Sequence, residues 1–134
     1  MQQPAPTPPS ATLVAEATRR SGVVWVGRAG EPPALVWHLW HDGSAWLLGG
    51  GREQAGEQVL PVGPGDDAVV VVRSKAAQAG VVVTWQAEVT AVEPGTPTWD
   101  EVLPLLAAER LNAPAGSDGR WAQECTVLRL TPRS

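Results

Sequence analysis

The stretch Val81–Val92 restricts the possible folds of this chain more than any other feature. Its sequence, VVVTWQAEVTAV, alternates an apolar set with a mixed set that includes Thr84, Gln86 and Glu88. A period of two places successive side chains on opposite faces of a β-strand. We therefore expect a long strand with one face on the core, and the core-facing residues are Val81, Val83, Trp85, Ala87, Val89 and Ala91. A strand of this length needs neighbouring strands to be stable.

Short apolar segments on both sides of this strand supply the expected partners. The predicted strands are Gly22–Gly27, Ala34–His41, Ala45–Gly49, Ala68–Arg73 and Gln123–Leu130. Asp42-Gly43 separates the second of them from the third, and an Asp-Gly pair is typical of a tight hairpin turn. The β-branched run AVVVVR predicts that Ala68–Arg73 is covered on both faces.

Two segments have the pattern of short helices. Ala11–Arg20 follows a Ser10 or Thr12 cap, and a second helix is expected from Thr98 to about Asn112, with Thr98 and Glu101 as a capping box. The segment 52–59 is expected to be a short helix or an irregular connection. The order of elements predicts a mainly β fold with two short helices.

Length and charge limit the classes of function. The chain has 134 residues, enough for one domain, and we expect a flexible Pro-rich tail over residues 1–10 and a single domain over residues 11–134. A net charge of −4 and a pI near 5.1 argue against nucleic-acid binding. No apolar window is long enough for a membrane span, and the N-terminus lacks the pattern of a secretory signal. We expect a cytoplasmic protein with no membrane partner.

Metal binding and hydrolytic chemistry receive no support from the sequence. Cys125 is the only cysteine, so neither an internal disulfide nor a Cys-based metal cage is expected. His38 and His41 lie three apart in a predicted strand, which would point them to opposite faces, so they could not share one metal ion.

The tryptophans differ in their expected positions. Trp25 and Trp85 are expected in the core, whereas Trp37 or Trp40 would face a cavity or a dimer surface.

The order of elements resembles the FMN-binding split barrel of the pyridoxamine-phosphate-oxidase-like proteins. The resemblance covers residues from about 11 to 132 and rests on element order and hydrophobic pattern. The matching stretches are Ser21–Gly27, Pro32–His41, Ser44–Gly51, Ala68–Lys75, Val81–Gly95, Thr98–Asn112 and Glu124–Pro132. It implies a small antiparallel split β-barrel that forms a homodimer.

The resemblance also implies a cofactor, FMN or the deazaflavin F420, in a groove between subunits. The isoalloxazine ring would lie along the backbone of Leu48, Gly49 and Gly50. The phosphate would contact Arg52, with further contacts from Arg73 and Lys75.

Two features of the residues themselves bear on this site. Consecutive glycines, Gly49–Gly51, let a ligand approach bare N–H groups, and the guanidinium of Arg52 can fork onto a phosphate. His38 is a further candidate for a hydrogen bond to the cofactor, beside a structural role. Where the family usually has a second basic residue, this chain has Glu53.

Three functions remain open at this point. The first is a flavin-binding protein, an oxidoreductase on an unidentified small molecule if it is an enzyme, in which the cofactor supplies the redox chemistry. The second is a split-barrel relative without cofactor that serves as a ligand- or protein-binding module, which Glu53 favours. The third is an unrelated small β-barrel that binds a small hydrophobic ligand through its tryptophans.

Overall fold

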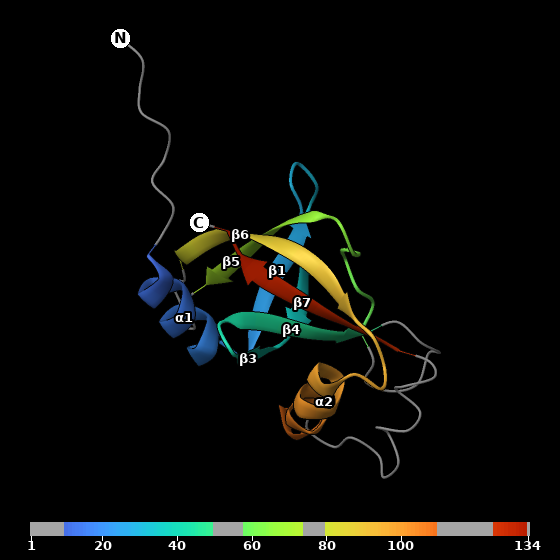
Figure 1. The fold of residues 1–134 in the computed structure, drawn as a ribbon. Coiled ribbons are helices and arrows are strands. Elements are labelled where there is room, and N and C mark those ends of the chain that lie inside the picture. Colours follow the sequence, from blue (N-terminus) through green and yellow to red (C-terminus); the bar gives the residue numbers. More distant parts are fainter. Residues whose placement is uncertain (1–9, 50–57, 74–79, 110–124, 134) are drawn as a thin grey trace.

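The computed structural model describes residues 10–49, 58–73, 80–109 and 125–133. Two helices and seven strands lie in these ranges (Figure 1). In chain order they are α1 (Ala11–Arg20), β1 (Val23–Arg28), β2 (Ala34–Trp37), β3 (Leu39–His41), β4 (Ser44–Gly49), β5 (Asp67–Arg73), β6 (Val81–Val92), α2 (Pro97–Glu109) and β7 (Thr126–Pro132). The predicted mainly β fold with two helices is confirmed.

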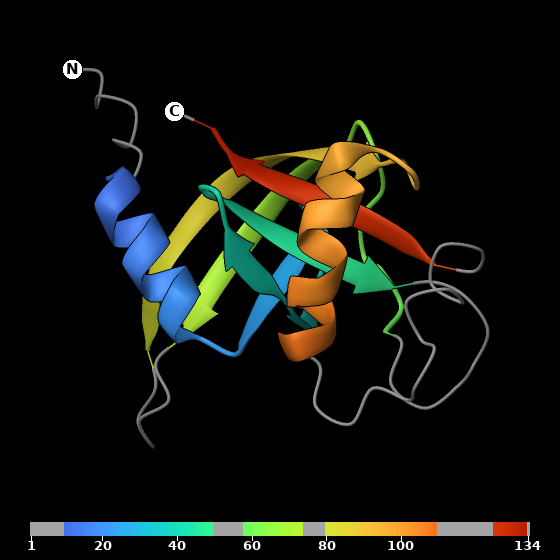
Figure 2. The ribbon, with the colours of Figure 1, turned by 60° about the horizontal axis from the view of Figure 1, so that its bottom comes forward.

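All seven strands form one antiparallel sheet in the order β2-β1-β5-β6-β7-β4-β3. The edge strands of this order, β2 and β3, are consecutive in the chain, with His38 alone between them. The sheet must therefore curl until its two edges arise from one stretch of backbone, and Figures 1 and 2 show this curved, barrel-like shape. The chain at His38 joins the two edges.

This topology corrects one sequence prediction. Ala34–His41 was expected to be one strand, but β2 pairs with β1 and β3 pairs with β4, so the pairing partner changes at His38. The hairpin after β3 is confirmed: Asp42 and Gly43 have φ of 50° and 70°, the positive angles that a tight two-residue hairpin turn requires.

The long strand β6 has the predicted bounds and carries the centre of the core. Val83, Trp85, Ala87 and Val89 are buried, and the residues between them are exposed. Val81 and Ala91, also expected in the core, are exposed because the strand extends past the core at both ends. In β5 the outward residues Val69 and Val71 are only half-buried, so the predicted coverage of both faces is incomplete.

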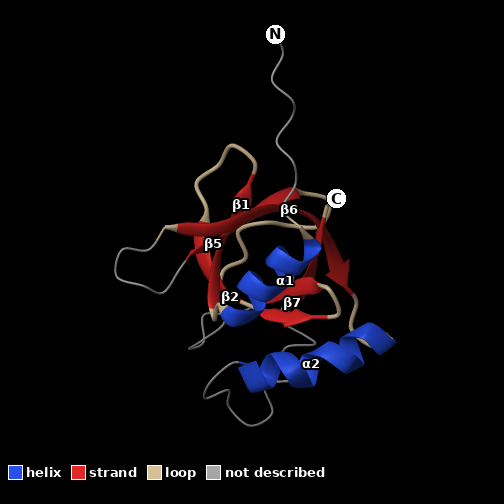
Figure 3. Cartoon of the chain, turned by 90° about the vertical axis from the view of Figure 1, so that its left-hand side faces the viewer, coloured by secondary structure: helices blue, strands red, loops and turns tan. Residues whose placement is uncertain are grey.

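The two helices cover different parts of the sheet. In Figure 3, α1 lies over one open end of the curved sheet, and α2 lies outside it. Ser10 caps α1 by accepting a hydrogen bond of 3.1 Å from the backbone N–H of Leu13. The cap of α2 is Thr96, whose hydroxyl accepts from the N–H of Trp99 at 3.3 Å. The Thr98–Glu101 capping box was therefore wrong, because Pro97 already occupies the first turn, where its missing N–H costs nothing.

Apolar side chains form two separate cores. One fills the inside of the curved sheet, and its members include Trp85, Val70 and Leu130. The other lies between α2 and the strands β3, β4 and β7, and includes Trp46 and Leu106. Trp25 was expected to be core, but it is half-buried and faces outward, because its neighbours Val24 and Val26 take the inner positions.

Candidate functional site

The end of β4, predicted to support a flavin ring, is packed against the protein's own chain. The side chain of Leu48 is fully buried and belongs to the core beneath α2. Its carbonyl oxygen accepts a hydrogen bond of 3.2 Å from Nε2 of Gln58. Gly49 is likewise buried and forms a parallel bridge with Gln58.

Gln58 fastens two strand ends together. Its Oε1 accepts from the N–H of Trp37 at 2.9 Å, and its Nε2 donates to the carbonyl of Trp37 at 2.9 Å as well as to Leu48. One side chain thus satisfies backbone groups at the ends of β2 and β4. Sequence reasoning missed this residue, because a single glutamine in an irregular segment carries no local signal of such a contact.

The glycine at position 49 has a structural explanation. A Cβ placed there would lie 2.4 Å from the carbonyl oxygen of Gln58 and 2.7 Å from Cγ of Leu60. Such approaches are far below van der Waals contact, so only glycine lets the two segments come this close. The prediction that Leu48 and Gly49 support a ring remains a prediction. Gly50, Gly51, Arg52 and Lys75 lie outside the described residues.

His38 joins the sheet to α1. Its side chain is 4% exposed, and its Nε2 lies 2.9 Å from the carbonyl oxygen of Thr18. The hydroxyl of Thr18 in turn accepts from Nε1 of Trp85 at 3.1 Å. These contacts fit the structural role that the sequence left open for His38; they do not test a contact to a cofactor.

Arg73 and Gly49 end different strands, and the curled sheet connects them by a short route. Val71 pairs with Trp25, so Arg73 is level with Val23, and Val23 pairs with Trp37. Gln58 bonds to Trp37 and forms a bridge with Gly49. The register thus places Arg73 about two strand spacings, roughly 10 Å, from Trp37, with Gly49 on the far side of Gln58.

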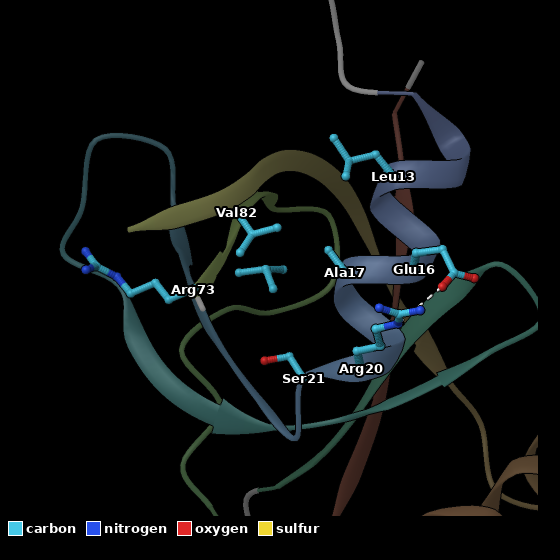
Figure 4. A pocket seen from close by; sticks show the side chains of 8 residues that line it. Leu13, Glu16, Ala17, Arg20, Ser21, Arg73 and Val82 are labelled. Carbon is cyan, nitrogen blue, oxygen red and sulfur yellow. Dashed lines mark ion pairs between the residues drawn. The ribbon is translucent and has the colours of Figure 1, made fainter. Parts of the chain in front are cut away.

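Arg73 borders a surface pocket of about 400 Å³ between α1 and the adjoining ends of β5 and β6 (Figure 4). Arg73 is exposed, and among the described residues it has no ion pair. Its guanidinium is thus available to an anion, the role that the resemblance implies for it.

The other charged side chains are mostly paired at the surface. Arg28 Nε donates to Oδ2 of Asp66 at 2.9 Å, and the N–H of Gly63 donates to the same oxygen at 2.7 Å. These two hydrogen bonds hold the pKa of Asp66 below its ordinary value, and the bond from Gly63 has the larger effect. Within the described ranges, no group of three or more His, Cys, Asp or Glu side chains is arranged to hold a metal ion.

Searches by sequence give no match, either to a protein-family model or to a curated protein. Comparison with solved structures, in contrast, gives clear matches. HutZ, the heme storage protein from Vibrio cholerae, matches 90% of this chain and 88% of its own with a TM-score of 0.62 and 15% identity. A Listeria innocua protein named as a pyridoxamine 5'-phosphate oxidase matches 92% of this chain and 94% of its own with a TM-score of 0.56 and 10% identity.

A third similar structure is the FAD-binding protein from Mycobacterium smegmatis, with a TM-score of 0.54, 9% identity, and coverage of 96% of this chain and 94% of its own. These likenesses span almost the whole length of each protein, and they decide the architecture. The chain has the split-barrel fold. The fold implied by the sequence resemblance is thus confirmed.

In this split barrel, β6 is the longest of the described strands. No helix in the described part of the split barrel has the length and apolar character of a membrane span.

Proposed function

We propose that this split-barrel protein is a homodimer that binds a flavin, FMN or F420, between its two subunits. Solved proteins with the same fold support a cofactor of this kind, since one is named for FAD and another for pyridoxamine 5'-phosphate oxidase. HutZ, a heme storage protein, shares the fold as well, so the fold alone does not choose the cofactor.

The observation that carries the proposal is the exposed apolar outer face of β2, β1 and β5, which extends to Arg73 at the end of β5. The resemblance implies a cofactor in a groove between subunits, so a second copy of the chain on this face would place residues of both subunits around the flavin. Arg73 would then belong to a site that requires two subunits.

The outer face of β2, β1 and β5 favours such an assembly. Trp25 lies at its centre, paired across the strands with Leu35 and Val71. Leu35 is 52% exposed, Val23 is 45% exposed, and Trp25 and Val71 are half-buried. A contiguous apolar face on a sheet typically marks an interface. A second copy of the chain is the occupant that we propose, because it would complete both this face and the flavin site.

The described residues fit a flavin in part. Arg73 offers an exposed guanidinium, which suits a phosphate or another anionic group. The backbone at Leu48 and Gly49 is already in contact with Gln58, so these two residues can offer an edge to the ring rather than an open platform. A bound flavin would supply hydride or electron transfer, and this chain would position it and exclude water.

The deciding experiment is the visible absorption spectrum of the purified protein, followed by titration with FMN and with F420 while the Trp fluorescence is recorded. We expect a yellow chromophore or saturable quenching at micromolar ligand, together with a dimer by light scattering. A colourless protein whose Trp fluorescence is quenched by neither FMN nor F420 would refute the flavin proposal.

The contact of Gln58 with the end of β4 favours a second candidate. If the chain's own segment permanently occupies that position, the protein would be a cofactor-free module that binds a ligand or a protein. Failure of both flavins to bind, with the dimer retained, would favour this candidate.

A further inference from the structure

The pocket between α1, β5 and β6 has an apolar floor. Four side chains from three elements form it: Leu13, Ala17, Val72 and Val82. Leu13 is 43% exposed and Val82 is 46% exposed, so the pocket leaves apolar surface in water that an apolar ligand would cover. Its volume of about 400 Å³ lies in the range of small-molecule sites.

The backbone is irregular at this position. The pairing of β5 with β6 shifts between Val72 and Arg73, which is a β-bulge or a similar irregularity. Bulges occur at the rims of barrels and beside binding sites, where they redirect side chains. Here the shift occurs opposite Val82, and all three residues line the pocket.

The rim of the pocket is positively charged. Arg20, at the end of α1, and Arg73, at the end of β5, lie on opposite sides of the pocket in Figure 4. Glu16 also lines it, but both of its carboxylate oxygens accept from Nη2 of Arg19, at 3.1 and 3.0 Å. Arg20 Nε lies 3.4 Å from Glu16 and its side chain is 76% exposed, so it can turn toward a ligand.

The hydroxyl of Ser21 donates to the carbonyl of Val23 at 2.8 Å, so the two arginines are the donors left for an anion. Arg20 and Arg73 are thus two cations on the lining of the pocket, and Glu16 is the one acidic residue on it. An apolar floor with a cationic rim is complementary to a molecule that has an apolar body and one negative group.

We propose that this pocket binds a small apolar carboxylic acid, with the carbon chain on Leu13, Ala17, Val72 and Val82 and the carboxylate on Arg20 or Arg73. This site goes beyond the proposed flavin site and does not depend on it. Arg73 is the one residue that both would use.

The test is isothermal titration of the full-length protein with three probes: decanoate, decanol and inorganic phosphate. We expect saturable binding of decanoate, at least tenfold weaker binding of decanol, and no binding of phosphate alone. No saturable binding of decanoate would overturn the proposal. If decanol bound as tightly as decanoate, the proposed role of the arginines would be wrong. If phosphate bound as tightly as decanoate, the proposed role of the apolar floor would be wrong.

Variants locate the binding. Val82→Glu puts a negative charge on the exposed floor, and it should weaken decanoate binding at least tenfold. Thr90→Glu adds the same charge on the same face of β6, outside the pocket, and should leave binding unchanged. Arg20→Gln combined with Arg73→Gln should remove the preference for decanoate over decanol. Arg28→Gln, on β1 and outside the lining, should keep it.

The flavin titration is run on the same preparations. A protein that binds decanoate but no flavin would refute the proposed cofactor alone. A protein that binds flavin but no decanoate would refute this pocket alone.

Discussion

The indole nitrogen of Trp85 donates a 3.1 Å hydrogen bond to the hydroxyl of Thr18, and both side chains are buried. The bond ties the longest strand to α1. The carbonyl of Thr18 also lies 2.9 Å from His38 Nε2, so one threonine connects the helix to the centre of the sheet and to the junction of its edges.

Thr18→Val should therefore destabilise the protein without changing its shape. Valine fills the same volume but leaves the indole N–H of Trp85 buried without an acceptor, which costs about 1–3 kcal/mol. Urea denaturation would measure the free energy of unfolding. Thr90→Val, at an exposed position of β6, is the matched control and should shift it by about 0.5 kcal/mol at most. Equal effects of the two variants would contradict the role of this bond.

Gly49→Ala should lower stability through overpacking. Its Cβ would lie 2.4 Å from the backbone oxygen of Gln58, so the two segments must move apart, at a cost of about 1–3 kcal/mol. Thermal or urea unfolding checks this. Gly22→Ala is the control, because nothing lies within 4 Å of a Cβ built there. A neutral Gly49→Ala would show that Gln58 is free to move away from β4, as an open ring platform requires.

The pair of Arg28 and Asp66 gives a prediction for acid. The bonds from Gly63 and Arg28 hold the folded-state pKa of Asp66 below its ordinary 3.8. Its contribution to stability is therefore present above the ordinary pKa and is lost as the pH falls through the lower, folded-state value. Asp66→Asn should lower the free energy of unfolding at pH 7. The difference in this free energy between the variant and the unmodified protein should become smaller in strong acid.

An NMR titration of the Asp66 carboxyl measures that pKa directly. In Arg28→Gln it should move upward, toward 3.8, while the bond from Gly63 keeps part of the depression. Titration of Asp66 at or above 3.8 in the unmodified protein would contradict this account.

The apolar outer face gives a prediction for assembly. Trp25→Glu places a charge at its centre, so the dimer should dissociate, and the flavin affinity should fall because the proposed site needs both subunits. Light scattering measures the mass, and the flavin titration measures the affinity. Thr90→Glu, the same change outside this face, should remain dimeric. A dimeric Trp25→Glu variant would move the interface elsewhere.

Much of the fold could be predicted because its signals are local. The bounds of α1 follow from its cap at Ser10, and those of β6 follow from the alternation of its side chains. The outward position of Trp25 could not be predicted, because the surrounding run GVVWVG is apolar on both faces. The break at His38 could not be predicted either, because it depends on which strands pair with β2 and β3.

The candidate site was harder to predict, because it also depends on which strands pair. Arg73 and Gly49 each end a strand, and residue type alone makes both plausible ligand contacts. Only the pairing of β5 with β1 and of β1 with β2, together with the contacts of Gln58, shows how these two strand ends are connected. The part played by Gln58 depends on a loop whose course no periodic pattern describes.

The single-residue junction between β2 and β3 has a consequence for aggregation. The edge of an open sheet offers unpaired backbone groups to other molecules, and such edges begin intermolecular β-sheet growth. Here both edges belong to one continuous segment, and Gln58 satisfies the N–H and carbonyl of Trp37 where they separate. A break in the backbone beside His38 would release both edges at once, and we expect a chain assembled from two fragments divided there to polymerise more readily than the intact chain.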